Sequence, residues 1–304
     1  MIQLPDDIVF FERGWLSSNN FLLRDAHQAW LVDTGYYSHA QQTEALLKSV
    51  LHDRPLTHIV NTHLHSDHCG GNAHLQTIYP NVHTLIPPGL SKHVVPWDDA
   101  GLTYAPTGQH CPPFSFTKTI CSGDSFVIAN RKWTAFSAPG HDPHSIIIFD
   151  ETNRILISAD ALWENGFGVV FPEIEGIDAF DEVNDTLDLI AKLEPKLVLP
   201  GHGQPFTDVE SALDRAKSRL HQFTSSENKH SDYAAKVLLK FKLLEFQQVS
   251  LTTFIDWGCK TPYLQLLHKK YQPNIAMDSW IHSLCGSLEK SGACQINNQV
   301  IVNT

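Results

Sequence analysis

Residues 62–71, which read THLHSDHCGG, carry three histidines and one aspartate within six consecutive positions. These side chains are His63, His65, Asp67 and His68. Imidazole and carboxylate groups bind zinc, iron or manganese, whereas burying four of them in an apolar core would be costly. The apolar segment 57–61, typical of a buried strand, precedes them, and two glycines end the run. We therefore expect a metal-binding loop that a sheet holds at the end of one strand.

Three further candidate ligands follow short β-like runs later in the chain, each beside glycine, proline or another small residue. They are His141 after residues 133–136, Asp160 after residues 154–157 and His202 after residues 196–199. A single histidine or aspartate at such a position is more often a hydrogen-bonded structural residue than a ligand. Four strand ends that together present seven ligand-type side chains are hard to explain as independent accidents. The set predicts that these side chains converge on one metal site.

The order of these residues resembles that of the metallo-β-lactamase superfamily. The likeness rests on His-x-His-x-Asp-His at 63–68, on His141, on Asp160 and on Gly-His-Gly at 201–203. It covers roughly residues 8–210, and the segment LVDTG at 31–35 matches the strand and turn before the metal loop in that family. The resemblance implies an α/β fold, an αββα sandwich with a one- or two-metal site at one edge. Asp33 would either fix a ligand or cap its turn, and the sequence favours neither role.

The resemblance also implies a role for each ligand. His63, His65 and His141 would hold one metal ion, Asp67, His68 and His202 a second, and Asp160 would bridge the two. The expected cofactors are two divalent ions, zinc first, with iron or manganese as alternatives. Two ions about 3.5–4 Å apart can lower the pKa of a shared water, so that a bridging hydroxide serves as nucleophile. Asp67 and Asp160 are the expected catalytic residues, since Asp67 can orient that water and pass its proton onward.

These features favour a metal-dependent hydrolase that acts on a small-molecule thioester, ester or lactone. Flavodiiron oxygen reductases carry glutamate in place of His65, and class B β-lactamases commonly carry cysteine in place of Asp160, so neither activity is expected. Hydroxyacylglutathione hydrolase has similar motifs, but its glutathione-gripping residues have no clear counterpart here. Three alternatives stay open. The first is an endoribonuclease of the β-lactamase-like type with a C-terminal winged helix, and the second is a mono-iron oxidoreductase similar to persulfide dioxygenase. The third is a catalytically idle interaction or regulatory protein that keeps metal for stability.

The chain is expected to divide into a catalytic domain, residues 1–222, and a small C-terminal domain, residues 223–304. Helices are predicted at residues 208–220, 233–241, 264–271 and 280–288, and a hairpin is predicted around residues 297–298. Helices followed by a short hairpin are typical of a winged-helix-like domain. Its aromatic and leucine side chains are expected to form core and not a ligand pocket.

Residues 87–125 are punctuated by proline and glycine and lack sustained periodicity, yet they carry many large side chains. Ordered loops of this length are commonly lids or binding loops. Because this stretch follows the metal loop closely, we expect it to cover the metal edge, with Trp97, Tyr104 and Phe114 lining a substrate pocket. An insertion packed on the body or at a dimer contact is the alternative. Asn165, in the loop after Asp160, is also expected to contact substrate.

Composition and charge narrow the expected partners. The net charge is −11 at pH 7, and residues 1–222 hold 14 lysines and arginines against 27 acids. An acidic catalytic body does not attract a polyanion over distance, so nucleic acid is not expected. No apolar run approaches the ~18–20 residues that span a bilayer, and the N-terminus lacks a signal-peptide pattern. With six cysteines in no paired spacing, we expect a cytoplasmic enzyme of small molecules. A homodimer is a hypothesis based on the aromatic loop.

Overall fold

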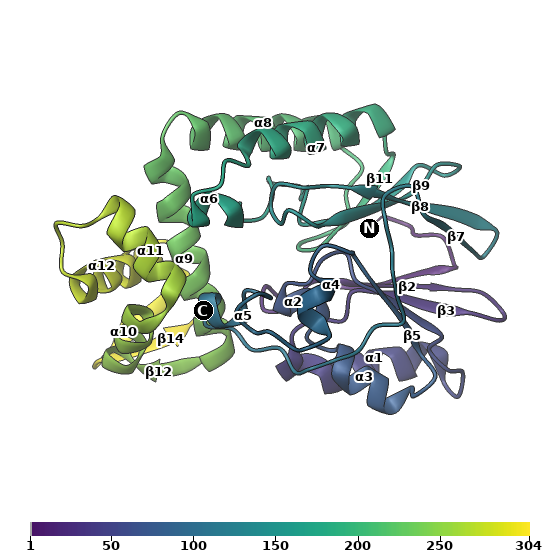
Figure 1. Cartoon of the computed structure of the whole chain (residues 1–304), viewed down its shortest axis with the longest axis horizontal. Helices are drawn as coiled ribbons and strands as arrows, with labels where there is room; N and C mark the ends of the chain where they lie inside the picture. Colours follow the sequence, from purple (N-terminus) through teal and green to yellow (C-terminus); the bar gives the residue numbers. More distant parts are fainter. Residues whose placement is uncertain (1) are drawn as a thin grey trace.

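Two mixed β-sheets pack face to face, and helices cover both outer faces (Figure 1). The computed structural model describes residues 2–304, with Glu227 described through its backbone only. The strands of the first sheet follow the order β1-β2-β3-β4-β5-β6. Their bounds are Ile8–Phe11, Asn20–Arg24, Ala29–Val32, His58–Val60, His83–Ile86 and Lys118–Thr119. The helices α1 (Ala40–Leu51) and α3 (Asn72–Ile78) lie on the outer side of this sheet, and the 3-10 turn η1 (Tyr37–His39) directly precedes α1.

The second sheet follows the order β11-β10-β9-β8-β7. Its strands β7 to β11 are Ser125–Ile128, Arg131–Ser137, Ile146–Asp150, Ile155–Ala159 and Leu197–Pro200. The strands β10 and β11 are parallel, whereas the other pairs are antiparallel. The short helix α6 (Phe171–Glu175) leads from β10 to α7 (Phe180–Leu193), and α8 (Val209–Thr224) follows β11. The helices α7 and α8 cover the outer face of this sheet.

Side chains that alternate along each strand fill the two apolar layers on either side of a sheet. Phe21 of β2 belongs to the apolar cluster between the two sheets, whereas its neighbour Leu22 belongs to the cluster beneath α1. Successive strand residues point to opposite faces, so both sides of the sheet are apolar and both are covered. Leu187 of α7 and Ala216 of α8 pack on the second sheet in the same way. Each fully buried leucine contributes about 1.5–3 kcal/mol, so the strand ends that carry the site are firmly held.

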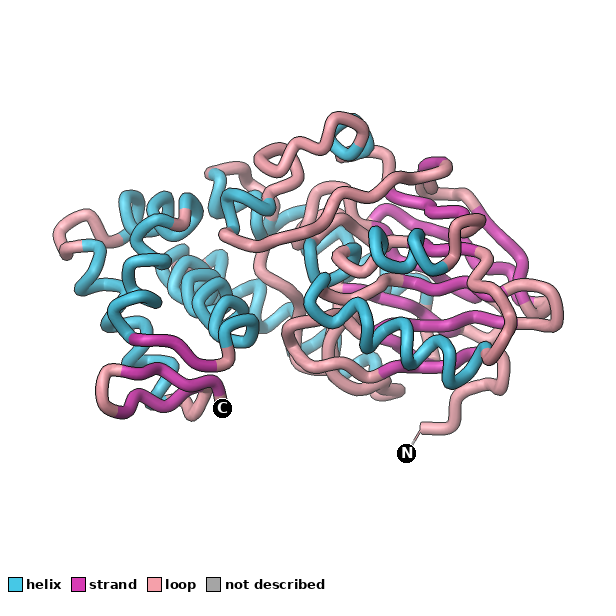
Figure 2. Tube along the Cα trace, turned by 90° about the horizontal axis from the view of Figure 1, so that it is seen from below, coloured by secondary structure: helices cyan, strands magenta, loops and turns pink. Residues whose placement is uncertain are grey.

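The C-terminal part of the chain forms its own apolar cluster beside the sandwich, as the view in Figure 2 shows. It contains the helices α9 (Glu227–Phe246), α10 (Leu251–Lys260), α11 (Pro262–Tyr271) and α12 (Met277–Lys290). A small sheet of order β12-β14-β13 completes it, with strands Gln248–Ser250, Val300–Asn303 and Cys294–Asn297 respectively. The sandwich with a C-terminal helical region, predicted from the sequence, is thus confirmed.

Two details of the C-terminal part differ from the sequence prediction. The hairpin is where it was expected, with Asn298 and Gln299 at positive φ in its turn, but β12 and α10 were not predicted. The strand β12 has only three residues and acquires its structure by pairing with β14 across a long stretch of chain. The division of the chain at residue 222 stays a prediction; that residue lies inside α8.

Residues 87–125 are ordered by packing on the sandwich. They contain the one-turn helices α4 (Ser91–Val94) and α5 (Tyr104–Thr107). A local apolar cluster joins this segment to the metal loop through Leu64 and Cys69.

No helix within residues 2–304 combines the length and apolarity needed to cross a membrane. The six cysteines are all free thiols.

Candidate metal centre

Four strand ends bring the predicted ligands to one edge of the sandwich. The first sheet supplies the loop after β4, which continues into the single-turn helix α2 (Ser66–Cys69). The second sheet supplies the segments that follow β8, β10 and β11. All seven predicted ligands fall into three groups whose ligand atoms lie within 4.8 Å of one another: His63, His65 and His141; His63, His68 and Asp160; Asp67, His68 and His202. The convergence predicted from the sequence is therefore present in the fold.

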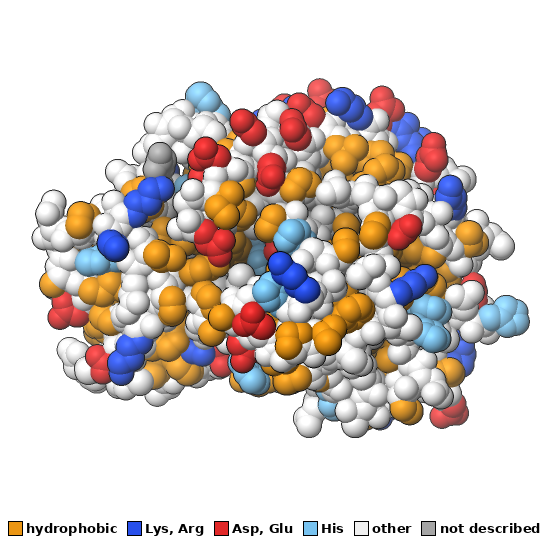
Figure 3. Space-filling view, in the orientation of Figure 1, with side chains coloured by type: hydrophobic (Ala, Val, Ile, Leu, Met, Phe, Trp, Pro, Cys, Tyr) orange, Lys and Arg blue, Asp and Glu red, His pale blue; other side chains and the backbone are white. Residues whose placement is uncertain are grey.

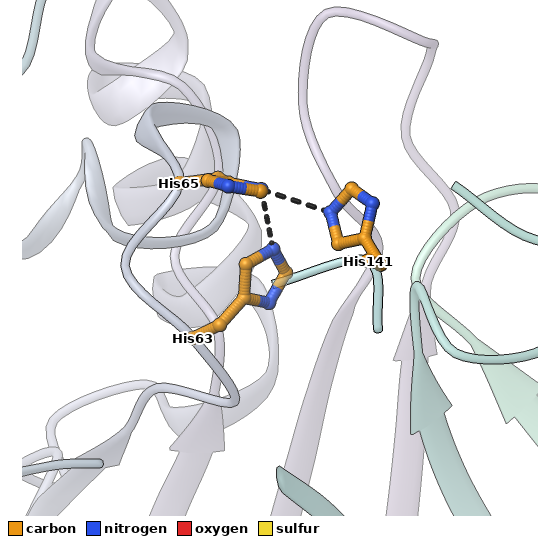
Figure 4. A group of neighbouring side chains, drawn as sticks. All are labelled: His63, His65 and His141. Carbon is orange, nitrogen blue, oxygen red and sulfur yellow. Dashed lines mark hydrogen bonds between the residues drawn. The ribbon is translucent and has the colours of Figure 1, made fainter. Parts of the chain in front are cut away.

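The first group consists of His63, His65 and His141, which Figure 4 draws. Nδ1 of His65 lies 2.9 Å from Nε2 of His63 and 2.9 Å from Nε2 of His141. Nδ1 of His141 donates to the carbonyl oxygen of Val169 at 2.6 Å, so the Nε2 of a neutral His141 ring carries a lone pair. Burial lowers the pKa of His141 to about 4 and that of His63 well below its ordinary value. Both rings are therefore neutral at neutral pH and suited to bind metal.

The second group consists of Asp67, His68 and His202. Oδ2 of Asp67 lies 3.2 Å from Nε2 of His202 and 3.8 Å from Nε2 of His68. Asp160 lies between the two groups, because its Oδ1 is 3.4 Å from Nε2 of His68 and its Oδ2 is 3.4 Å from Nε2 of His141. This position is the one expected of a bridging carboxylate.

The ring of His68 provides the test of whether a metal fits. Its Nε2 is fully buried and has no hydrogen-bond partner. A buried polar atom without a partner is costly and calls for an explanation. Burial opposes a positive charge on this ring, yet the carboxylates of Asp160 and Asp33 outweigh burial and raise the pKa of His68 well above its ordinary value. The nearby carboxylates thus favour a positive charge next to Nε2. A divalent cation would supply that charge and would also bind the lone pair of Nε2.

Local backbone geometry aims Asp160 into the site. The register between β10 and β11 shifts between Ile157 and Ala159, and Ala159 has a φ of 47°. A left-handed conformation at a residue other than glycine costs about 1–3 kcal/mol and is found most often at functional sites. Two glycines then allow close approach. A Cβ on Gly201 would lie 2.3 Å from Oδ1 of Asp160, and one on Gly168 would lie 2.3 Å from Nδ1 of His141.

A cavity of about 380 Å³ opens above these ligands. Its walls include the ligands His65, Asp67, His141, Asp160 and His202. Tyr104 and Asn165, two of the predicted substrate contacts, border it as well. Much of the remaining wall is apolar and is formed by Val169, Phe171, Val237 and Leu238. Figure 3 shows hydrophobic side chains gathered along the boundary between the C-terminal part and the sandwich, next to exposed histidines.

Trp97 and Phe114 differ from the prediction, since neither borders this cavity. Their rings pack edge to face at 5.2 Å within the apolar cluster under residues 87–125. Trp97 has a φ of 52°, and its Nε1 donates to Asp99 at 3.1 Å. The segment therefore borders the cavity only through Thr103, Tyr104, Thr107 and Gln109. The sequence identified aromatic residues in the segment correctly but could not tell which of them face the ligands.

Several cavity residues were not predicted, and they come from distant segments. Trp15, in the loop after β1, stacks on His202 with ring centroids 5.2 Å apart. Arg219 of α8 lies over the ring of Tyr233 of α9 at 5.5 Å, and both border the cavity with Phe241. The C-terminal aromatic residues were expected to be core. Phe241 is buried and Tyr233 packs against two apolar clusters, but both also border the cavity, which the sequence did not predict. Helical periodicity identifies the apolar face of α9 but not the cavity that part of this face borders.

The proteins to which this chain is similar are named as thioesterases or as members of the metallo-beta-lactamase family. The chain is 28% identical over 164 residues to acyl-coenzyme A thioesterase MBLAC2 of Gallus gallus, a match that covers 50% of this chain and 58% of that protein. It is 26% identical over 227 residues to the protein of the same name from Bos taurus, covering 67% and 80%. The crystal structure of a metallo-beta-lactamase family protein from Thermus thermophilus matches with a TM-score of 0.56. At 17% identity over 98% of both chains, this likeness shows a shared fold that includes the C-terminal part.

The family itself is established by a broader comparison. The model of the metallo-beta-lactamase superfamily matches residues 13–202, a span that contains every ligand of the three groups. This match agrees with the resemblance seen in the sequence and with the sandwich and edge site seen in the structure. The chain belongs to the metallo-β-lactamase superfamily.

Proposed function

We propose that this chain is a metal-dependent hydrolase of small-molecule acyl thioesters. The observation that carries the proposal is the convergence of seven ligand-type side chains, five of which border a cavity whose walls are largely apolar. An apolar pocket with a few polar groups is typical of a small-molecule site. The similarity of the chain to proteins named thioesterases supports a thioester, over an ester or a lactone, as its substrate.

Two divalent ions fit the ligand groups. His63, His65 and His141 would hold one, and Asp67, His68 and His202 the other, with Asp160 shared between them. The nitrogen-rich set suits zinc first, with iron and manganese as alternatives. When bound, such ions supply Lewis acidity and make water available as a nucleophile at neutral pH.

The chain's own residues have separate tasks in this reaction. Asp67 borders the cavity and would accept a proton from the attacking water, then deliver it to the sulfur that leaves. Asp33 and Val169 hold the rings of His68 and His141 in the tautomers that leave Nε2 free. Water attack on the acyl carbon and cleavage of the carbon–sulfur bond then give a carboxylic acid and a thiol.

Polar groups on the cavity wall would orient the substrate. The side-chain amide of Asn165 and the guanidinium of Arg219 border the cavity. Arg219 donates through Nη1 to the carbonyl oxygen of Phe167 at 3.3 Å, which leaves further N–H groups for a carbonyl or amide oxygen of the thioester. Tyr104 contributes its ring, because its hydroxyl donates to the carbonyl oxygen of Leu64 at 2.8 Å.

The test is thiol release by protein stripped with a chelator and reloaded with zinc, iron(II) or manganese. The substrates are acetyl-coenzyme A, the matched N-acetylcysteamine thioester and S-lactoylglutathione. We expect turnover of the first two that depends on metal. The ratio of their kcat/KM values reports whether the nucleotide is recognised. A protein that binds metal but cleaves none of the three, and no longer-chain acyl thioester of N-acetylcysteamine either, would overturn the proposal.

A matched pair of variants locates the reaction at the site. Asp160→Asn is expected to lower the metal content and to lower kcat. The fall in kcat should exceed the ~10–100-fold loss that follows when a residue hydrogen-bonded to a metal ligand is replaced. Asp150→Asn changes a carboxylate that is also buried but pairs with Arg131 at 3.1 Å. Asp150 ends β9 opposite the start of β10, whereas Asp160 follows the other end of β10. The Asp150 variant should keep its metal. Full activity in the Asp160 variant would mean that the site lies elsewhere.

A further inference from the structure

A second, almost wholly apolar groove of about 230 Å³ lies along α9. Its walls include Leu244 of α9 and Leu288 of α12, neither of which borders the metal cavity. Leu288 is 5% exposed and Leu244 is half-buried. Tyr233, Val237 and Phe241 continue the wall at helical spacing along the same helix. The groove therefore runs along one face of α9 and is also bordered by Leu288 of α12.

This groove is continuous with the metal cavity. Trp15, Tyr233, Val237 and Phe241 border both. Trp15 stands at the junction, where its ring stacks on His202 and meets the ring of Trp163 edge to face at 5.4 Å. Even with these contacts Trp15 is 56% exposed. Part of the substrate would cover this exposed aromatic side chain beside the metal ligands, which explains its exposure in the free protein.

The chemistry of the groove excludes a polar occupant. Two lysines border it, but their ammonium groups are engaged elsewhere. Nζ of Lys240 donates to the carbonyl oxygen of Ala293 and to Asn303, each at 2.6 Å, and Nζ of Lys236 pairs with Asp232 at 2.6 Å. The lysines thus offer the groove their methylene stems. The amides of a pantetheine arm would lose their hydrogen bonds to water here without replacement, whereas a hydrocarbon chain loses nothing.

We propose that the groove between Trp15, α9 and Leu288 receives the acyl chain of the thioester, so that the enzyme selects straight aliphatic acyl groups long enough to pass Trp15. The inference rests on the proposed thioesterase function. The thioester carbonyl then lies over the ligands, and the thiol part leaves through the polar side of the cavity near Asn165. Each methylene that enters the groove is expected to raise kcat/KM about fourfold, which corresponds to ~0.8 kcal/mol of transfer free energy.

The experiment uses the metal-loaded full chain and N-acetylcysteamine thioesters with straight acyl chains from acetyl to hexadecanoyl. We expect kcat/KM to be low for acetyl, to rise over the chain lengths that occupy the groove and then to level off. Leu244→Trp fills the groove and should lower the dodecanoyl-to-acetyl ratio of kcat/KM at least tenfold. Leu244→Asn, a smaller polar change, should lower the same ratio if the bulky variant does not fold.

The matched control is Leu266→Trp, which places the same bulk on α11 at a leucine that is 45% exposed and borders neither cavity. It should keep the wild-type ratio. A chain-length profile that is flat in the wild type, or a ratio unchanged in both Leu244 variants, would overturn the acyl groove while leaving the thioesterase proposal intact.

A binding measurement separates failure of the groove from failure of the reaction. The S-dodecyl and S-ethyl thioethers of N-acetylcysteamine cannot be hydrolysed, and calorimetry gives their affinities without turnover. Tighter binding of the dodecyl compound to the wild type, lost in Leu244→Trp and kept in Leu266→Trp, supports the groove even if no thioester is cleaved. Equal binding of the two thioethers to the wild type would overturn it.

Discussion

Oδ2 of Asp33 lies 2.8 Å from Nδ1 of His68, and both side chains are completely buried. The same carboxylate accepts hydrogen bonds from the backbone N–H and the hydroxyl of Thr62 at 2.9 and 2.8 Å. Thr62 in turn lies 3.1 Å from Nδ1 of His63. One aspartate at the end of β3 therefore fixes the tautomer of His68 directly and that of His63 through a threonine. Nε2 of each ring is left for a metal ion.

Replacing Asp33 by asparagine should weaken metal binding without changing the fold. The amide has nearly the same size but no negative charge, so it no longer favours the donating tautomer of His68 or the charge of a bound cation. We expect a loss of about 10–100-fold in metal affinity and a fall in kcat of similar size. Competition with a chromophoric chelator gives the affinity.

A control for Asp33 uses a pair of the same kind outside the site. Oε2 of Glu44 lies 2.6 Å from Nε2 of His74 near the surface. Glu44→Gln should leave metal affinity and kcat unchanged. Equal effects of the two changes would show that Asp33 acts through general stability and not through His68.

Gly168→Ala should displace His141 from the first ligand group. The new methyl carbon would lie 2.3 Å from Nδ1 of that ring, far inside van der Waals contact. The ring also bonds to the adjacent carbonyl of Val169, so it cannot turn away without losing that bond. Misplacement by about 1 Å can cost ~100-fold in rate, and a fall of this order in kcat is expected. Gly14→Ala, where nothing lies within 4 Å of the added carbon, should have no effect.

Trp97→Ala is expected to lower stability and to leave KM unchanged. Its ring packs on Phe114 and Tyr104 at centroid distances of 5.2 and 6.0 Å, and of these three residues only Tyr104 borders the cavity. Removing a half-buried aromatic ring should cost about 1–2 kcal/mol, below the ~3–5 kcal/mol of a fully buried one. Urea unfolding and steady-state kinetics measure the two quantities. A raised KM at unchanged stability would show that Trp97 contacts the substrate, as the sequence predicted.

The convergence of the candidate ligands could be predicted from the sequence because each lies shortly after a strand. A strand end and the residue after it are fixed by local sequence, and His141, Asp160 and His202 needed only the sheet to bring them together. The cavity wall could not be predicted, because it depends on how distant segments pack. Trp15, Arg219 and Tyr233 meet only after α8 and α9 dock on the sandwich. Trp97 shows the same limit, since its positive φ turns its ring into a local cluster.

Stability should depend on pH through His230, a buried histidine of α9. Its Nε2 accepts a hydrogen bond from the backbone N–H of Val170 at 3.2 Å, and the rings of Phe180 and Phe223 surround it. Burial, with a smaller effect of Lys270, lowers the pKa of His230 from 6.5 to about 4. Between pH 4 and pH 6.5, His230 is therefore protonated in the unfolded chain but neutral in the folded chain.

His230→Gln removes this titration and keeps an acceptor for Val170. The contribution of His230 to stability is complete above pH 6.5 and is lost as the pH falls toward 4, since protonation favours the unfolded chain there. Relative to the Gln variant, the wild type should thus lose about 3 kcal/mol of unfolding free energy between pH 7 and pH 4, at ~1.4 kcal/mol per pKa unit.

Urea unfolding at several pH values gives the difference, and the metal-ligand histidines cancel because both proteins contain them. His282→Gln, a change at an exposed position of α12, should give no such difference. Parallel pH curves for the wild type and the His230 variant would show that this ring is protonated in the folded protein or exposed before unfolding.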